Sequence, residues 1–169
     1  MSETSATDVD RFASRADDFG VSVSQTAPDA AAETIGDLLE PPSVATPLPW
    51  DDVALPDAVT TDPTPAQLDA ATTGVTAAGL AIADYGSLLL RATPDGSEPV
   101  SLFPDLHVAV LRASDIVPDM ETALSRFGED CRDRRQSAIV ATGPSATADM
   151  GALVRGAHGP TEVHVVVVR

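Results

Sequence analysis

The amino-acid sequence predicts an α/β protein in which helices flank a mostly parallel sheet. Its N-terminal part alternates amphipathic helical segments with short strand segments, and a β-α-β order favours parallel strands joined by right-handed crossovers. The last strand segment, Val163 to Val168, contains no Asp, Glu, Lys or Arg and ends in four valines, which is typical of a strand buried on both faces. The C-terminal strand is therefore expected in the interior of the sheet.

The length of the chain suits one domain with a sizeable core. Of its 169 residues, 43% are hydrophobic and only 4% are aromatic, so the core must be built mainly from small aliphatic side chains. Residues 1–7 are polar and are expected to form a flexible N-terminus, and residues 8–169 are expected to form a single domain.

The N-terminal half is expected to contain three helices and two short strands. Apolar residues at helical spacing (Val9, Phe12, Ala16) support the first helix, and proline fits the first position of a helix begun at Thr64-Pro65. In order, the expected elements are a helix from Asp8 to Phe19 ended by Gly20, a strand at 21–24, a helix begun by Asp29, a strand at 44–45 and, after a proline-rich segment at 46–65, a helix from Pro65 to about Thr73 stopped by Gly74.

The C-terminal half is expected to contain mainly strands. Apolar runs separated by turn residues indicate them, and Asp84-Tyr85-Gly86 is the turn that joins the first two. The expected elements are strands at 80–83, 87–90, 107–111, 137–141 and 163–168, with one helix that starts at Pro118 and whose apolar face is formed by Val117, Met120, Leu124 and Phe127.

Charge narrows the possible partners. Acids outnumber bases 26 to 10, the net charge is -16, and all ten bases are arginine. Self-repulsion of this size is tolerable where salt screens it, since the screening length falls to about 3 Å at about 1 M ionic strength. We therefore expect a cytoplasmic protein from a halophilic cell, with its acids on a solvated surface. Nucleic acids and anionic membranes are not expected partners, because both need basic patches, and no apolar run approaches the ~20 residues that span a membrane.

The cysteine and histidine content argues against a metal or cofactor site. Cys131 is the only cysteine, so the chain cannot form an internal disulfide or hold an iron–sulfur cluster by itself. His107, His158 and His164 do not have the spacing of a local metal motif, and separate hydrogen-bonded histidines are the simpler explanation. No metal and no cofactor is expected. His158 stands out because it lies in a glycine-containing loop where its imidazole can face a cleft.

The candidate site lies in the stretch from Ala141 to Val168, which contains two Gly-Pro dipeptides at the ends of apolar runs. Such dipeptides mark loops at strand ends, where α/β proteins often carry functional residues, although two purely structural turns are the alternative. The first loop can open a short helix whose free N–H groups bind an anion, with Ser145 as a helix cap or as a ligand-binding hydroxyl. The candidate ligand-binding residues are Gly143, Ser145, Thr147, Asp149, Gly156 and Gly159, with His158 as a candidate catalytic residue.

Four blocks of the chain match motifs of one known family. Gly74–Leu90, G-V-T-A-A-G-L-A-I-A-D-Y-G-S-L-L-L, is similar to G-[VI]-T-G-A-D-x-A-I-A-E-T-G-T-[LI]-V-L, and Thr142–Met150, T-G-P-S-A-T-A-D-M, is similar to S-G-P-S-x-T-A-D-I. Val100–Pro118 and Leu153–Val168 match two further blocks, the second through its G-x-H-G-P and H-V motifs. On these blocks the sequence resembles the lactate-utilisation protein C family, also called the LUD domain, over roughly residues 70–169.

This resemblance implies an α/β domain of the NagB/RpiA/CoA-transferase-like kind. Members of the family work with two iron–sulfur proteins in a system that oxidises L-lactate to pyruvate. The chain has no set of cluster ligands, so the resemblance implies the cluster-free component, with the iron–sulfur lactate-utilisation proteins as partners. A small anionic or nucleotide-like ligand is expected, and Thr76, which lies in the first block, joins the candidate ligand-binding residues.

The sequence departs from the family motif in its first block. Ala77-Ala78-Gly79 replaces G-A-D, and Asp84 replaces a glutamate. The related CoA transferases use a glutamate in a turn before glycine as nucleophile, and Asp84 keeps the carboxylate on a side chain one methylene shorter. Asp84 is therefore a candidate catalytic residue as well as a turn former. A stand-alone acyl- or phosphoryl-transfer enzyme and a non-catalytic ligand-binding module are the alternative functions.

Overall fold

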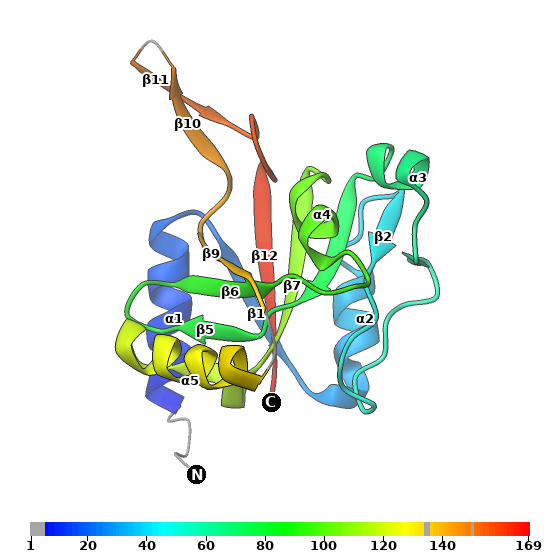
Figure 1. Cartoon of the computed structure of the whole chain (residues 1–169). Coiled ribbons are helices and arrows are strands. Elements are labelled where there is room, and N and C mark those ends of the chain that lie inside the picture. The colour runs from blue at the N-terminus through cyan, green and yellow to red at the C-terminus, as the bar shows by residue number, and fades with distance from the viewer. Residues whose placement is uncertain (1–5, 134–135, 150) are drawn as a thin grey trace.

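A computed structural model describes residues 6–133, 136–149 and 151–169 (Figure 1). Its centre is a six-stranded sheet with the order β1-β12-β7-β4-β2-β3, in which every neighbouring pair is parallel. This confirms the predicted α/β class with a mostly parallel sheet. The strands of this main sheet are β1 (Ser22–Thr26), β2 (Ser43–Ala45), β3 (Thr60–Thr61), β4 (Thr73–Ala77), β7 (Leu106–Arg112) and β12 (Glu162–Val168).

The C-terminal strand β12 lies between β1 and β7, as its run of valines predicts. Its side chains alternate between two hydrophobic clusters, with Val165 and Val167 in one and Val166 and Val168 in the other. Strand β7 alternates in the same way. Both faces of the main sheet are therefore buried, which is why neither strand shows the polar alternation of a half-exposed strand.

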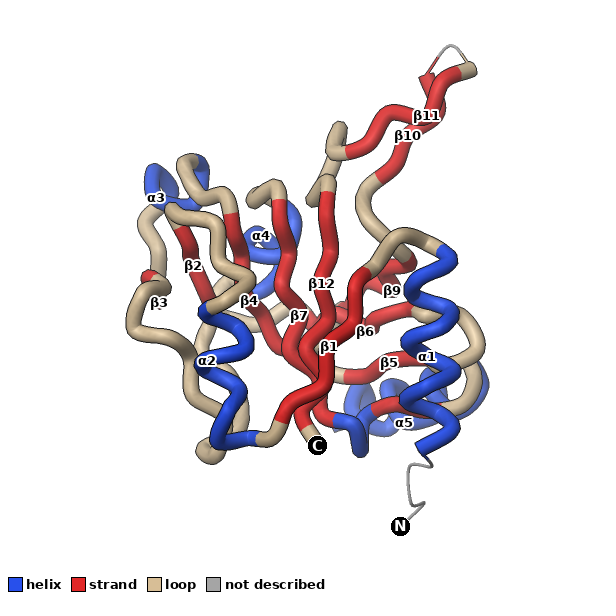
Figure 2. Tube along the Cα trace, turned by 180° about the vertical axis from the view of Figure 1, so that it is seen from behind, coloured by secondary structure: helices blue, strands red, loops and turns tan. Residues whose placement is uncertain are grey.

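Helices cover the two faces of the main sheet (Figures 1 and 2). Helix α2 packs on one face, α4 packs on the other over β4 and β7, and α1 lies at the β1 edge. The helices are α1 (Ala6–Asp18), α2 (Ala31–Gly36), α3 (Pro65–Asp69), α4 (Ser97–Leu102) and α5 (Met120–Asp133), with 3-10 turns at Pro28–Ala30 and Ala113–Asp115.

A second, smaller sheet crosses the face of the main sheet that carries α4 (Figure 1). Its order is β8-β5-β6-β9, and it is antiparallel except for the β5–β8 pair. The strands are β5 (Leu80–Ile82), β6 (Ser87–Arg91), β8 (Ile116–Val117) and β9 (Ala138–Thr142). The sequence pattern predicts β5, β6 and β9 but not their separation from the main sheet, because periodicity does not tell which strands pair.

A two-stranded arm projects from the body of the molecule (Figure 1). It pairs β10 (Ala146–Asp149) with β11 (Ala152–Arg155) in antiparallel register. The predicted short helix opening at Gly143–Thr147 is therefore wrong: the segment leads into an extended strand, and its amides do not form a helix N-terminus. Side chains of the arm are exposed on both faces, and Leu153 is 68% exposed.

The predicted helix from Pro65 to about Thr73 is too long. Helix α3 ends at Asp69, and Thr73 and Gly74 already belong to β4. Gly74 is not a helix stop but a contact point, because a Cβ at this position would overlap the carbonyl oxygen of Val100 in α4. The absent side chain lets the backbone of α4 lie directly on β4, and this position of α4 shapes the cavity described next.

Candidate functional site

The candidate site is a cavity of about 390 Å³ between the two sheets. It lies at the amino ends of β1, β12 and β7, beneath the base of the arm, and its remaining walls come from α4 and from β6 and β9. A cavity of this size is in the range that holds small organic ligands. The lining residues are Val21, Gly86, Leu88, Leu90, Ser101, Leu102, His107, Ile139, Ala141, Thr142, Gly143, Pro144, Ser145, Ala146, His158, Gly159, Pro160 and Val163.

His107 provides a buried polar group in this cavity. The side chain is only 2% exposed, and its Nε2 lies 2.9 Å from the hydroxyl oxygen of Thr76 on the neighbouring strand β4. Burial lowers the pKa of His107 to about 4, because a charged imidazolium would lose its hydration there. The ring is therefore neutral at physiological pH. Thr76 does not line the cavity itself and contributes by holding His107.

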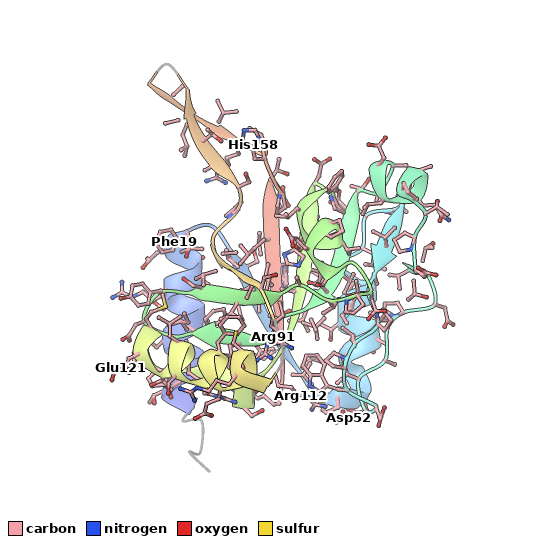
Figure 3. All side chains as sticks on the ribbon, in the orientation of Figure 1. Phe19, Asp52, Arg91, Arg112, Glu121 and His158 are labelled. Atoms are coloured by element: carbon pink, nitrogen blue, oxygen red, sulfur yellow. The ribbon has the colours of Figure 1, made fainter. Side chains whose placement is uncertain are left out.

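Four of the residues predicted from the two loops meet at the rim of the cavity: Gly143, Ser145, His158 and Gly159. The amide of Ser145 donates to the carbonyl of Pro160 at 2.9 Å, and the amide of Gly156 donates to the carbonyl of Ser145 at 3.0 Å. These bonds hold the two loops together as the base of the arm. The backbone amide of Ser145 is therefore already used, and its hydroxyl is the group left for a ligand. Figure 3 shows His158, which is exposed, at this base.

Backbone conformation explains why a glycine occurs at each end of the arm. Gly143 and Gly156 both have a φ of +75°, in the left-handed region that residues with a Cβ rarely adopt. One glycine precedes β10 and the other follows β11. Gly156 therefore shapes the base of the arm and does not itself line the cavity.

The other predicted site residues lie away from the cavity. Asp84 is exposed in the turn between β5 and β6, where its carboxylate pairs with Nε of Arg11 at 3.3 Å. Thr147 lies on the arm opposite Val154. The backbone of Asp149 ends β10, and its side chain lies outside the described part of the structure. The structure thus brings Ser145 and His158 to one cavity but does not bring Asp84 to them.

Sequence analysis missed three polar groups of the site. His107 was one of three histidines without a motif, and neither Ser101 nor Thr142, a hydroxylated residue of the candidate stretch, was among the predicted ligand-binding residues. Ser101 reaches the cavity because α4 sits on Gly74, and its hydroxyl donates to the carbonyl of Glu98 at 2.8 Å. One signal was available for His107: a histidine in an otherwise apolar buried strand needs a polar partner or a ligand.

The electrostatic character of the cavity differs from that of the whole protein. None of its described lining residues is Asp, Glu or Arg, in a chain that has 26 acids among 169 residues. Its polar groups are neutral hydroxyls and imidazoles. Within the described residues, no group of three or more His, Cys, Asp or Glu side chains is placed to hold a metal ion.

A second cavity of about 440 Å³ lies at the opposite, carboxyl ends of β2, β4 and β7. Ligands of open α/β sheets often bind at carboxyl ends. This cavity, however, carries the carboxylates of Asp95 and Asp115, and its one arginine, Arg91, is paired with Asp130. It is also lined by Ala77-Ala78-Gly79, the segment that departs from the family motif. The second cavity is therefore less suited to an anion than the first.

The described helices give no sign of a membrane-spanning segment, since none of them combines sufficient length with sufficient apolar character. Cys131 is half-buried, with its thiol 3.8 Å from the carbonyl oxygen of Gln136.

The fold and the cavity define an α/β protein with a parallel central sheet and a ligand-sized cavity at the amino ends of its strands. Comparison with known proteins identifies the particular family. The chain belongs to the LUD domain family, whose model matches residues 58–168. The resemblance inferred from the four sequence blocks is thereby confirmed.

Relatives of this chain include several bacterial proteins named Lactate utilization protein C. The protein from Deinococcus radiodurans is 30% identical over 169 aligned residues, which cover 94% of this chain and 78% of that protein. The Bacillus licheniformis protein is 34% identical over 116 residues, covering 66% of this chain and 48% of the relative. The Oceanobacillus iheyensis protein is 30% identical over 99 residues, covering 56% and 42%. The chain thus spans less than half the length of the last two relatives.

Among solved structures, the chain resembles the crystal structure of a DUF162 family protein from Deinococcus radiodurans. The TM-score is 0.76 at 24% sequence identity, over 97% of this chain and 98% of the other. This likeness establishes the fold over almost the whole chain.

Proposed function

We propose that this chain is the cluster-free component of an iron–sulfur system for L-lactate utilisation, in which lactate is oxidised to pyruvate, and that it binds a small organic anion in the cavity between its two sheets. The name shared by its relatives supports the lactate-utilisation role. The chain supplies a single cysteine, whereas an iron–sulfur cluster needs about four ligands, so the clusters would belong to partner proteins.

The observation that carries the ligand proposal is the absence of acids from the cavity lining. In a protein with a net charge of -16, an anion approaches most of the surface against repulsion. The cavity lining is one part of the described structure that contains no carboxylate and offers hydroxyl and imidazole groups instead. A small carboxylate, or a nucleotide-like anion small enough for the cavity, is the kind of ligand that these groups suit.

The residues at the rim have separate roles in this proposal. The Ser145 hydroxyl donates a hydrogen bond to the anion, and the exposed imidazole of His158 lies where it can contact the ligand as it enters. The bonds between Ser145, Gly156 and Pro160 hold these two side chains at one edge. Ser145 and His158 are thus proposed to bind ligand, and a catalytic role for His158 stays a prediction.

Copurification tests the proposed role. A tagged chain would be recovered from lactate-grown cells of its source in concentrated salt, and the captured proteins would be identified by mass spectrometry. We expect iron–sulfur proteins in the eluate, with their visible absorption, and far less of them from cells grown without lactate. An eluate that contains no iron–sulfur protein under either condition would count against the accessory role.

The alternative of a stand-alone transferase gains no support from the site. It requires Asp84 as nucleophile beside Ser145 and His158, but Asp84 is held by Arg11 outside the cavity. Activity on an acyl-CoA or a sugar phosphate that is abolished by Asp84→Asn would restore this alternative. A binding module without chemistry is compatible with the same cavity and predicts a ligand that copurifies unchanged.

A further inference from the structure

The cavity is lined by both polar and apolar side chains. Its polar side chains are Ser101 of α4, His107 of the main sheet, Thr142 at the end of β9, and Ser145 and His158 at the base of the arm. Three of its larger apolar side chains, Leu88, Leu90 and Ile139, come from β6 and β9 of the second sheet, and Val21, Leu102 and Val163 come from the main-sheet side and α4. A ligand that fills the cavity therefore has to combine a polar group with an apolar body.

The hydrogen bond from Thr76 determines what His107 can offer. Among the described residues, the Thr76 hydroxyl has no partner other than Nε2 of His107, and Nδ1 of His107 has none. If Nε2 carried the proton, the hydroxyl proton of Thr76 would be buried without an acceptor, which is costly. The arrangement that satisfies the Thr76 hydroxyl has it donating to Nε2, so the proton of the neutral ring is on Nδ1, where it is available to a ligand.

From this geometry we infer that the ligand is a carboxylate with an apolar chain or ring, larger than lactate, and that Nδ1–H of His107 donates a hydrogen bond to its carboxylate. This inference rests on the proposed anion-binding function and specifies its ligand class. A three-carbon hydroxy acid would leave most of a 390 Å³ cavity unfilled and has no apolar body to cover Leu88, Leu90 and Ile139. An apolar body against β6 and β9 gains the favourable transfer free energy of each buried methylene.

Calorimetric titration with three simple probes tests this ligand class. Hexanoate has both the carboxylate and the chain, L-lactate has the carboxylate without the chain, and 1-hexanol has the chain without the carboxylate. In about 1 M KCl, which screens the net charge, we expect hexanoate to bind about tenfold or more tightly than either of the others. Fluorescence of Trp50, the only tryptophan, which lines the second cavity, should stay unchanged because that cavity is not occupied.

Variants and nitrogen NMR test the role of His107 separately from its role in folding. Thr76→Val keeps the shape of the side chain but removes the hydroxyl that orients the ring, and it should weaken hexanoate binding about tenfold. His107→Gln should weaken it at least as much. In the wild-type protein, the ring nitrogen signals should show a proton on Nδ1 and none on Nε2, and the Nδ1–H proton should shift downfield on adding hexanoate.

The outcomes separate the inference from the proposed function. Lactate binding as tightly as hexanoate would overturn the inference and leave anion binding intact. Hexanoate binding with the proton on Nε2, or without an effect of Thr76→Val, would overturn the role of His107. Hexanol binding as tightly as hexanoate would show an apolar site and would overturn the inference that the ligand is a carboxylate. Failure of all three probes to bind would also overturn this inference and would leave a nucleotide-like anion as the remaining form of the anion proposal.

Discussion

The stability of this protein should depend on pH through His107. Its pKa is about 4 in the folded chain and 6.5 in the reference state, so the unfolded chain binds more protons between these values. A group with a lowered pKa in the folded state contributes stability that is lost as the pH falls, here from about 6.5 down to about 4. The protein should therefore become less stable on acidification in a range where most of its carboxylates are still ionised.

The expected size of this effect follows from the two pKa values. Linkage gives a loss of about 2 kcal/mol in the free energy of unfolding between about pH 7 and pH 5, and about 3 kcal/mol in total below pH 4. Burial also lowers the pKa of His164, which adds to the loss, whereas the raised pKa of Asp115 acts in the opposite direction. The contribution of His107 must therefore be isolated by a variant.

His107→Gln is the matched variant, because its amide can still bond Thr76 but does not titrate. Urea unfolding of both proteins would be followed by circular dichroism at several pH values in constant high salt. The wild-type protein should lose about 2 kcal/mol more than the variant between pH 7 and pH 5. Parallel curves would refute the burial of a neutral His107. Should the variant not fold, an imidazole NMR titration in the wild-type protein supplies the same test, since His107 must stay neutral at pH 5.

Three further predictions concern stability. Gly74→Ala should lower the free energy of unfolding by several kcal/mol, because the added methyl group overlaps the Val100 carbonyl. Gly128→Ala, in α5 with open space around it, should raise the free energy of unfolding by about 0.5–1 kcal/mol. Urea unfolding measures both variants, and equal effects would contradict the close contact between α4 and Gly74. Asp119→Ala should lower the denaturation midpoint, since the carboxylate of Asp119 accepts from the Thr122 amide at 2.8 Å at the start of α5; an unchanged midpoint would exclude this cap. The thermal midpoint should rise steeply with KCl concentration, and a midpoint independent of salt would argue against a halophilic protein.

The local pattern of the sequence predicted part of the fold, but it did not predict β4, α4 or the two strands of the arm. Helical spacing predicted α1 and α5, and the uncharged valine run placed β12 inside the sheet. The end of α3 was misplaced because glycine commonly ends helices, and nothing near Gly74 indicates that a helix some 25 residues later needs its missing side chain. The division of strands between two sheets depends on long-range pairing, which local periodicity does not encode.

The site was predicted in part. Two glycine-proline loops indicated Ser145 and His158, because loop chemistry is visible in sequence, and the structure brings both to one cavity. Asp84 also lies in a turn between apolar segments, but α1 places Arg11 beside it and its side chain does not line the cavity, although Gly86 of the same turn does. His107 required knowledge of a neighbour 31 residues away, since its significance comes from the bond to Thr76.

The base of the arm joins the exposed arm to the wall of the cavity. Ser145 belongs both to the cavity wall and, through its bonds to Pro160 and Gly156, to the junction that sets the direction of the arm. A protein that binds the arm in one fixed orientation would therefore act on the same junction as a ligand that contacts Ser145. Thermodynamic reciprocity then requires that if the ligand changes the affinity for the partner by some factor, the partner changes the affinity for the ligand by that same factor.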